Sequence, residues 1–284
     1  METLPNDIYS LFDPDSTHVP NEENLEEFAS NLKDLLRVRL SERDTSRGPL
    51  RFSALGKPDR QIWFDAHPNG TEEKMSGKTY FKFLYGDIIE QVLLFLAKEA
   101  GHSVEATQKQ VEVDGVKGSI DAIIDGVVVD VKSASPHGYK KFKQGNLVND
   151  DPFGYVAQLS GYSAELTPGK SAAWVAMDKV TADICVSPLS SSVIQDNLPA
   201  PRIKHLKEVI AQSEPPPLCY SPKPRGASGN MELPTGCSYC VHKFRCHPTV
   251  RTFLYSTGPA YLTKVVKESE VPEITDYSNL GIEN

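Results

Sequence analysis

Near the middle of the chain, two runs of β-branched residues flank the pair Asp125-Gly126, which is typical of a β-hairpin with a two-residue type I′ turn. Residues at equal distances from such a turn face each other, so Asp121 is expected opposite Asp130. Opposed side chains share one face, with about 4.5–5.5 Å between their Cβ atoms, and strand alternation adds Lys132 to this face. The other face is apolar and is predicted to contact the core: Ile120, Ala122, Ile124, Val127, Val129 and Val131.

The two opposed aspartates need a partner, because like charges that face each other destabilise a hairpin. A divalent cation supplies that partner, and hard carboxylate oxygens favour Mg²⁺ or Mn²⁺. The sequence therefore predicts a metal site at Asp121 and Asp130, with Lys132 beside it. The alternative is that these side chains merely line the solvated face of an edge hairpin.

The composition is that of an ordinary folded protein, with 284 residues, 39% of them hydrophobic and 24% charged. No apolar run approaches the roughly 18 residues of a membrane span. The acidic, proline-containing N-terminus does not resemble a signal peptide, so we expect a cytoplasmic protein with no membrane partner. The net charge of −8 argues against a protein that coats nucleic acid non-specifically, but an enzyme with local basic patches remains compatible with it.

Patterning divides the chain into four expected regions. They are an N-terminal helical region (1–79), a core of helices and strands (80–212), a Pro/Gly-rich segment with cysteines (213–267) and a flexible acidic tail (268–284). The first 21 residues are expected to be poorly ordered. The sequence further predicts a loop over 43–50, helices from Glu22 and over 82–100, 151–166 and 202–212, and strands over 108–113, 172–177 and 183–186.

Three polar residues on the expected helices are candidates for the same site. Glu90 lies in the apolar middle of its helix, where it either reaches the surface or needs a partner such as a cation held by Asp121 and Asp130. Gln158 and Tyr162 are four residues apart and share one helix face. That face is either an ordinary, partly buried polar stripe or is directed at a lysine and a phosphate group.

Four cysteines lie close together in the C-terminal part of the chain, in the pattern Cys219-x17-Cys237-x2-Cys240-x5-Cys246. Disulfides are disfavoured in a cytosolic protein, whereas a CxxC pair with two further thiols is typical of a Zn²⁺ site or an iron–sulfur cluster. The alternative is four unrelated thiols. The ligand set also stays open, because a histidine could replace one thiol; the nearby candidates are His242 and His247.

In this order, the residues resemble the RecB-type branch of the PD-(D/E)xK nuclease superfamily. Its pattern is an acid or histidine on a helix, an aspartate at a strand, (D/E)xK on the next strand and QxxxY on a later helix. Here it falls on residues 80–165, with these matching positions: Glu90, Asp121, Asp130-Val131-Lys132 and Gln158 with Tyr162. The C-x2-C-x5-C block resembles that of iron–sulfur nucleases such as the CRISPR adaptation nucleases, and the chain is similar to phage-encoded members.

The chain departs from this family at two positions. Iron–sulfur members place their first cluster cysteine in an N-terminal segment, whereas here Pro58 stands near that position and no cysteine precedes residue 185. Either Cys219 replaces the missing ligand or the site holds zinc. The second departure is Glu90, which stands where many members have a histidine, and a carboxylate is expected to serve the same coordinating role.

The resemblance implies an α/β, restriction-endonuclease-like core, in which helices flank a central mixed β-sheet, and a C-terminal metal site held by cysteines. It implies Mg²⁺ or Mn²⁺ held by Asp121, Asp130, Glu90 and the Val131 carbonyl, with Lys132 as the catalytic lysine. Gln158 and Tyr162 would position that lysine and the DNA backbone. A structural [4Fe–4S] cluster, or alternatively Zn²⁺, would be held by the four cysteines: Cys219, Cys237, Cys240 and Cys246.

The activity implied is metal-dependent hydrolysis of DNA phosphodiesters, with exonuclease action on DNA ends or single strands favoured by analogy. A partner in recombination or a helicase is a further expectation, and a phage-encoded member would act in the host cytoplasm. Two alternatives stay open. One is a structure-specific endonuclease or junction resolvase with the same site, and the other is a non-catalytic DNA-binding subunit.

Overall fold

The hairpin expected at Asp125-Gly126 is present in the computed structural model, which describes residues 1–41, 50–70 and 77–275. Asp125 and Gly126 have φ angles of 50° and 75°, the left-handed backbone that a type I′ turn requires at both positions. They connect strand β4 (Ala122–Ile124) to strand β5 (Val127–Ala134). The register pairs Ala122 with Val129, as the sequence predicts.

This hairpin belongs to a mixed five-stranded sheet in the order β1-β4-β5-β6-β7. Strand β5 pairs with β6 in parallel, and the other neighbours are antiparallel. The β4–β5 hairpin is therefore central, and the alternative of a solvated edge hairpin is wrong. The remaining strands of the sheet are β1 (Val104–Glu105), β6 (Ala172–Asp178) and β7 (Ile184–Leu189).

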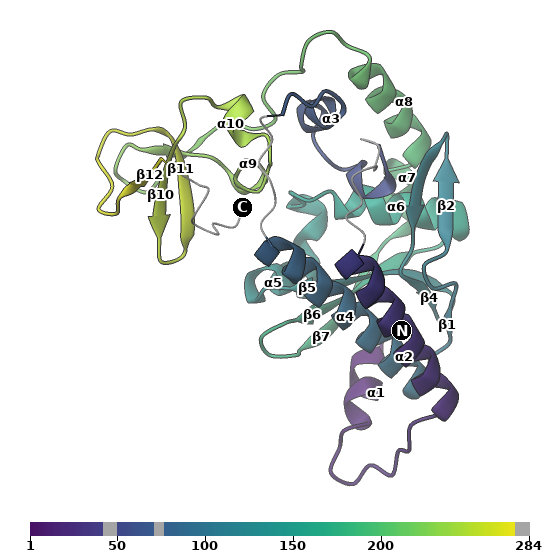
Figure 1. Cartoon of the computed structure of the whole chain (residues 1–284). Helices are drawn as coiled ribbons and strands as arrows, with labels where there is room; N and C mark the ends of the chain where they lie inside the picture. Colours follow the sequence, from purple (N-terminus) through teal and green to yellow (C-terminus); the bar gives the residue numbers. More distant parts are fainter. Residues whose placement is uncertain (42–49, 71–76, 276–284) are drawn as a thin grey trace. The chain divides into compact units, whose positions relative to one another are not determined.

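Helices cover both faces of this sheet (Figure 1), which explains why β5 is buried on both sides. Helices α1 (Leu4–Ser10) and α4 (Gly77–Glu99) pack on the apolar face of the hairpin, where Ala122, Ile124, Val129 and Val131 meet Leu4, Ile8, Ile89 and Leu93. Helices α5 (Pro136–Lys143) and α6 (Tyr155–Leu166) contact β5 and β6 from the other side. The α/β class and the central mixed sheet flanked by helices are thus confirmed.

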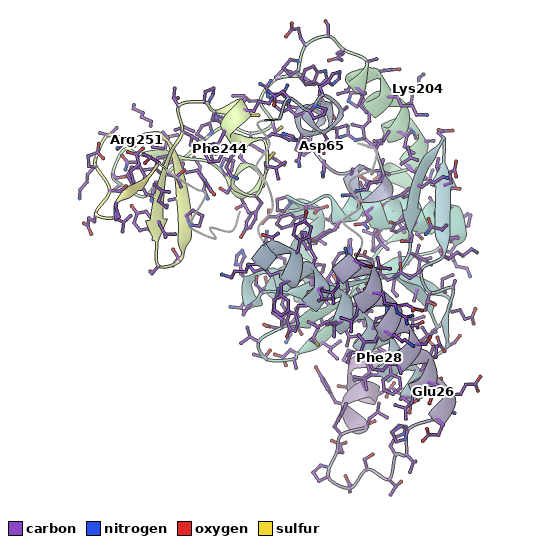
Figure 2. The ribbon with its side chains drawn as sticks, viewed as in Figure 1. Glu26, Phe28, Asp65, Lys204, Phe244 and Arg251 are labelled. Atoms are coloured by element: carbon purple, nitrogen blue, oxygen red, sulfur yellow. The ribbon has the colours of Figure 1, made fainter. Side chains whose placement is uncertain are left out.

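Helix α2 (Glu22–Ser41) begins after Asn21, whose side chain accepts hydrogen bonds from the backbone N–H groups of Glu23 and Asn24, at 2.9 and 3.2 Å. Phe28 of α2, labelled in Figure 2, packs on Phe95 of α4 with 5.0 Å between the ring centroids. A separate hairpin consists of β2 (Gln110–Val113) and β3 (Val116–Ser119). Shorter elements complete this part of the chain: η1 (Phe52–Ala54), η2 (Asn146–Asn149), α7 (Ser191–Asp196) and α8 (Pro199–Ile210).

The chain divides into two compact units, one formed by residues 1–56 and 83–204 and the other by residues 57–82 and 205–284. The second unit contains α3 (Asp59–Ala66), α9 (Thr235–Ser238), α10 (Lys243–Cys246) and an antiparallel sheet in the order β12-β10-β11-β9-β8. The strands of this sheet are β8 (Lys223–Pro224), β9 (Met231–Glu232), β10 (Arg251–Tyr255), β11 (Gly258–Lys264) and β12 (Glu273–Ile274).

Several local expectations are wrong. Residues 1–21 contain α1, which is held by its buried side chains Leu4 and Ile8. Strand β12 pairs with β10 inside the stretch expected to be a flexible tail. The loop expected over 43–50 and the end of the tail, 276–284, lie outside the described residues, apart from residue 50. None of the described helices is long and apolar enough to cross a membrane.

Candidate active site and cysteine cluster

Asp121 lies just before β4, outside regular strand geometry, whereas Asp130 lies within β5. The strand expected to run through residue 121 is interrupted: β3 ends at Ser119 and β4 begins at Ala122. The Asp121 side chain is therefore not held to the alternation of a β-strand. Its Oδ2 atom accepts a 2.6 Å hydrogen bond from the backbone N–H of Val131. The Val131 side chain packs in the core, as predicted.

Asp130 is buried on β5, with an exposed fraction of 2%. The Nζ atom of Lys132 lies 2.7 Å from both of its carboxylate oxygens, but only Oδ1 accepts with good hydrogen-bond geometry. Among the described residues, Oδ2 is a buried polar atom that no hydrogen bond satisfies. The ion pair with Lys132 is therefore the interaction that Oδ2 has, and a bound cation would add a ligand bond to it.

Burial and crowding of like charges shift the pKa values of the acids around Asp130. Burial, followed by repulsion from Asp121, Asp87 and Asp130, raises the pKa of Glu90 to about 8. Burial and the charge of Asp130 raise the pKa of Asp121 to about 7. Burial likewise raises the pKa of Asp130, despite the adjacent lysine. The three predicted acids therefore form one electrostatic cluster, which favours a divalent cation.

Lys132 remains a cation in this environment. Burial alone would lower its pKa, but the charges of Asp130 and Asp121 raise it above its ordinary value. The ring of Tyr155, the first residue of α6, lies 4.8 Å from the Lys132 Nζ atom and forms a cation–π contact. Lys132 is thus held between an aspartate and an aromatic ring, next to the acidic cluster.

Gln158 and Tyr162 lie on one face of α6, as predicted. The Gln158 Nε2 atom is 3.5 Å from the Tyr162 hydroxyl, and the tyrosine ring stacks on Phe52 at a centroid distance of 5.0 Å. Burial raises the pKa of Tyr162 to about 12, so that its hydroxyl stays protonated. A Cβ atom at Gly118 would lie 2.8 Å from this hydroxyl, which means that β3 approaches closely only because residue 118 is glycine.

A cavity of about 970 Å³ opens over this cluster. Four of the sequence-predicted residues line it, namely Glu90, Asp121, Gln158 and Tyr162. Other parts of its wall come from α2, from α4, from the β2–β3 hairpin and the turn before it, and from the segment before η1, including Arg39, Asp87, Lys117, Gln108 and Arg51. Asp130 and Lys132 are not among the lining residues, and Arg39 forms a 2.6 Å ion pair with Asp87.

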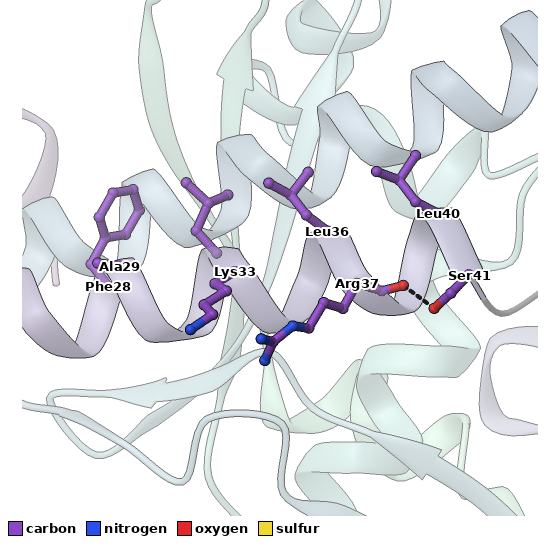
Figure 3. Close-up of a pocket in the computed structure, with 8 residues that line it drawn as sticks. Phe28, Ala29, Lys33, Leu36, Arg37, Leu40 and Ser41 are labelled. Carbon is purple, nitrogen blue, oxygen red and sulfur yellow. Dashed lines mark hydrogen bonds between the residues drawn. The ribbon is translucent and has the colours of Figure 1, made fainter.

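A second cavity of about 640 Å³ runs along α2 and contains none of the predicted site residues. Figure 3 shows Phe28, Leu36 and Leu40 along one side of it, with Lys33 and Arg37 on the other. This stripe carries no acid, thiol or histidine. It contains none of the acids of the predicted site, so the acidic cavity is the candidate active site.

The four clustered cysteines converge in the second unit. Cys219, Cys237, Cys240 and Cys246 line one small pocket of about 20 Å³, together with Pro58, Lys243 and His247. Burial and the neighbouring thiols raise the pKa of Cys237 to about 12, and burial raises that of Cys240 to about 11. Closely spaced thiols with raised pKa values ionise readily only when a cation joins them.

Further groups around this pocket fit thiolate ligands. The Arg60 Nε atom donates to the Cys246 sulfur at 3.3 Å, which would stabilise a thiolate. His242, an alternative ligand in the sequence, does not line the pocket and instead binds Asp65, which is labelled in Figure 2, at 2.7 Å. As the side chains are placed, no three of Cys, His, Asp and Glu in the described part of the chain are close enough to hold a metal ion.

Sequence reasoning did not assign three residues that contact or surround the acidic cluster. Asp87 lies one helical turn before Glu90, and its charge contributes to the raised pKa of Glu90. The three-residue spacing that places both acids on one helix face is visible in the sequence. Tyr155 contacts the lysine through the first turn of α6. Gln108 donates from its Nε2 atom to Glu90 Oε1 at 2.8 Å, and no sequence signal indicated this contact.

Comparison with protein-family models and with curated proteins gave no match. Among solved structures, the chain is similar to the crystal structure of SSO0001, with 17% identity and a TM-score of 0.43 over 78% of this chain and 96% of that one. It is also similar to an alkaline exonuclease (LHK-Exo) from Laribacter hongkongensis, with 12% identity and a TM-score of 0.33 over 56% and 93% of the two chains. Both TM-scores lie below 0.5, and neither similarity carries an argument about this chain.

Proposed function

We propose that this chain is a metal-dependent deoxyribonuclease that hydrolyses DNA phosphodiester bonds, acting on DNA ends or single strands. The observation that carries the proposal is Asp130, a buried carboxylate with one oxygen that no hydrogen bond satisfies among the described residues. It lies beside a cationic lysine and within a cluster of acids. Acids and a lysine at one cavity are the groups that metal-assisted phosphate hydrolysis needs.

Each residue at the cavity has a distinct role in this proposal. Glu90, Asp121, Asp130 and the Val131 carbonyl would hold Mg²⁺ or Mn²⁺, which polarises the phosphate and lowers the pKa of the attacking water. Lys132 orients that water or stabilises the charge that develops on the phosphate oxygens. Its contact with Asp130 fixes the Nζ atom in place.

Gln158 and Tyr162 supply hydrogen-bond donors at the wall of the cavity. The raised pKa keeps the Tyr162 hydroxyl protonated, so it can donate to a phosphate oxygen of the DNA backbone. The cavity volume of about 970 Å³ is in the range of small-ligand sites, about 300–1,000 Å³. This size suits a few nucleotides of one strand and supports action on ends or single strands.

The proposal is tested with end-labelled linear DNA and covalently closed circular DNA, each incubated with Mg²⁺ or Mn²⁺ and analysed on gels. We expect progressive loss of the linear DNA, no cleavage in excess EDTA and an intact closed circle. Asp130→Asn should abolish the activity, whereas Asp178→Asn, at another buried aspartate on the neighbouring strand β6, should retain it. Efficient nicking of the circle would favour the endonuclease alternative, and cleavage that persists in EDTA would overturn the mechanism.

For the second unit, we propose a structural metal site held by Cys219, Cys237, Cys240 and Cys246. The shared pocket and the Arg60 donor support thiolate ligands at this point. A [4Fe–4S] cluster is favoured and Zn²⁺ is the alternative, and either would join the Pro/Gly-rich segment to α9 and α10 within this unit. Anaerobically purified protein should be brown with stoichiometric iron and sulfide, or colourless with one zinc ion. Protein with neither metal would contradict the proposal.

A further inference from the structure

Gln108 adopts an uncommon backbone conformation at the rim of the acidic cavity. Its φ angle is 54°, in the left-handed region that favours glycine. The Lys109 N–H donates to the Ala106 carbonyl at 3.1 Å, so Gln108 is the third residue of a tight turn. Glycine or asparagine is the usual residue where a turn needs positive φ at this position. The turn alone therefore gives no reason for a glutamine.

The Gln108 side chain provides that reason. Its Nε2 atom donates to Glu90 Oε1 at 2.8 Å, which leaves Oε2 of Glu90 available for a second interaction. No other hydrogen-bond donor to Glu90 is present in residues 1–41, 50–70 and 77–275. The backbone N–H of Gln108 also donates to the Asp121 carbonyl at 3.3 Å. One residue thus connects the two acids on the floor of the cavity through both its side chain and its backbone.

Fixing Glu90 matters because three of the four charges that act on its carboxylate are repulsive, with Lys132 as the attractive one. Asp121, Asp87 and Asp130 all act on it as like charges, which favours rotation of the Glu90 side chain away from the cluster. A hydrogen bond from a neutral amide opposes that rotation without adding a charge. Groups that orient a metal ligand in this way typically change metal affinity by about 10- to 100-fold when removed.

We propose that Gln108 is a positioning residue that holds the Glu90 carboxylate in place for the divalent cation, and that the turn adopts its left-handed backbone to direct this side chain. The inference rests on the proposed function, because it assigns Glu90 as a ligand. In this proposal, the side chain of Gln108 supports metal binding, whereas its left-handed backbone conformation lowers the stability of the protein.

The test compares three variants by calorimetric titration with Mn²⁺ and by thermal melting of the metal-free protein. Gln108→Gly relieves the backbone strain but removes the amide, and Gln108→Asn tolerates the left-handed region but is one methylene too short to reach Glu90. Both should weaken Mn²⁺ binding by about 10-fold or more, while the melting temperature stays equal or rises. Ala106→Gly is the matched control, because Ala106 has the same φ of 54°. It should raise the melting temperature and leave Mn²⁺ affinity unchanged.

The Asp130→Asn variant measures how much Mn²⁺ binds to the protein outside the proposed site. If the unsubstituted protein binds Mn²⁺ at this site and both Gln108 variants bind it equally well, the positioning role is wrong and the proposed function stands. If the unsubstituted protein binds no more Mn²⁺ than the Asp130→Asn variant, the proposed function fails and this inference fails with it. If Ala106→Gly weakens Mn²⁺ binding as much as the Gln108 variants do, the effect comes from the turn as a whole, and the positioning role is likewise wrong.

Discussion

At alkaline pH and without metal, we expect Asp121→Asn to stabilise the protein. The pKa of Asp121 is raised in the folded state by burial and by Asp130. The folded protein therefore keeps this proton over a pH range in which the unfolded chain has released it. As a result, the free energy of unfolding falls as the pH rises from about 4 to about 7, and the full penalty is present above that range. An asparagine carries no such charge.

The size of the effect follows from the pKa. A rise from the ordinary value of 3.8 to about 7 corresponds to at most about 4 kcal/mol. Asp121 is partly exposed to solvent, which reduces this contribution, and we expect about 1–2 kcal/mol. The asparagine Oδ1 atom can still accept the hydrogen bond from the Val131 N–H, so the change isolates the charge.

Urea unfolding at pH 4 and pH 8, in EDTA and in saturating Mg²⁺, measures this effect. Asp125→Asn on the same hairpin is the control, because it should change the free energy of unfolding in the opposite direction. Burial alone would raise the pKa of Asp125, but hydrogen bonds from the Met1 amino group and His102 lower it to about 2. The Asp125 carboxylate therefore stabilises the fold above about pH 4, and its removal should destabilise the protein at pH 8.

Magnesium should reverse the order of stability of the unsubstituted protein and the Asp121→Asn variant. A ligand that binds the folded state stabilises it in proportion to the logarithm of its concentration, so Mg²⁺ should stabilise the unsubstituted protein and not the Asp121→Asn variant. The reasoning is refuted if Asp121→Asn is no more stable than the unsubstituted protein at pH 8 in EDTA, or if its advantage is the same at pH 4.

Three further predictions concern other parts of the molecule. Cys219→Ala should lose bound metal, and adding Pro58→Cys to that variant should restore it, because both positions line the cysteine pocket. If metal analysis shows the same loss in the variant with both substitutions, the two positions do not share a ligand role. Arg60→Met should speed the loss of metal to a chelator, because it removes the donor to the Cys246 sulfur, and an unchanged rate would argue against that role. Gly118→Ala should destabilise the protein by about 1–3 kcal/mol in urea unfolding, because the added Cβ would lie 2.8 Å from the Tyr162 hydroxyl; full retention of stability would show that β3 can move.

The hairpin was predictable because its signal is local. A type I′ turn needs positive φ at two adjacent positions, and Asp-Gly meets this requirement at low cost, so the turn fixes the register and brings Asp121 and Asp130 together. The same pair occurs at Asp114-Gly115, with φ angles of 48° and 77°, and forms the β2–β3 hairpin. That hairpin was missed although its pattern alternates: Val111, Val113, Val116 and Gly118 form one apolar face, and the opposite face is polar.

Other features depend on tertiary contacts that the sequence does not display. Helix α1 is short and polar in composition, and it is stabilised by inserting Leu4 and Ile8 into the core of the first unit. The interruption of the strand before Asp121 arises because the chain passes from the β2–β3 hairpin to the central sheet at this point. The left-handed backbone of Gln108 is likewise invisible in the sequence, since glutamine has no preference for it.

The central claim is that the acids around Asp130 form a divalent metal site, and anomalous diffraction from crystals soaked in Mn²⁺ tests it most directly. We predict one strong anomalous peak in contact with carboxylate oxygens of Glu90, Asp121 and Asp130, and its disappearance in Asp130→Asn crystals. A peak would also place the metal next to the buried Oδ2 atom that no hydrogen bond satisfies among the described residues. The absence of a peak at this cluster at saturating Mn²⁺, or its persistence in the variant, would contradict the account.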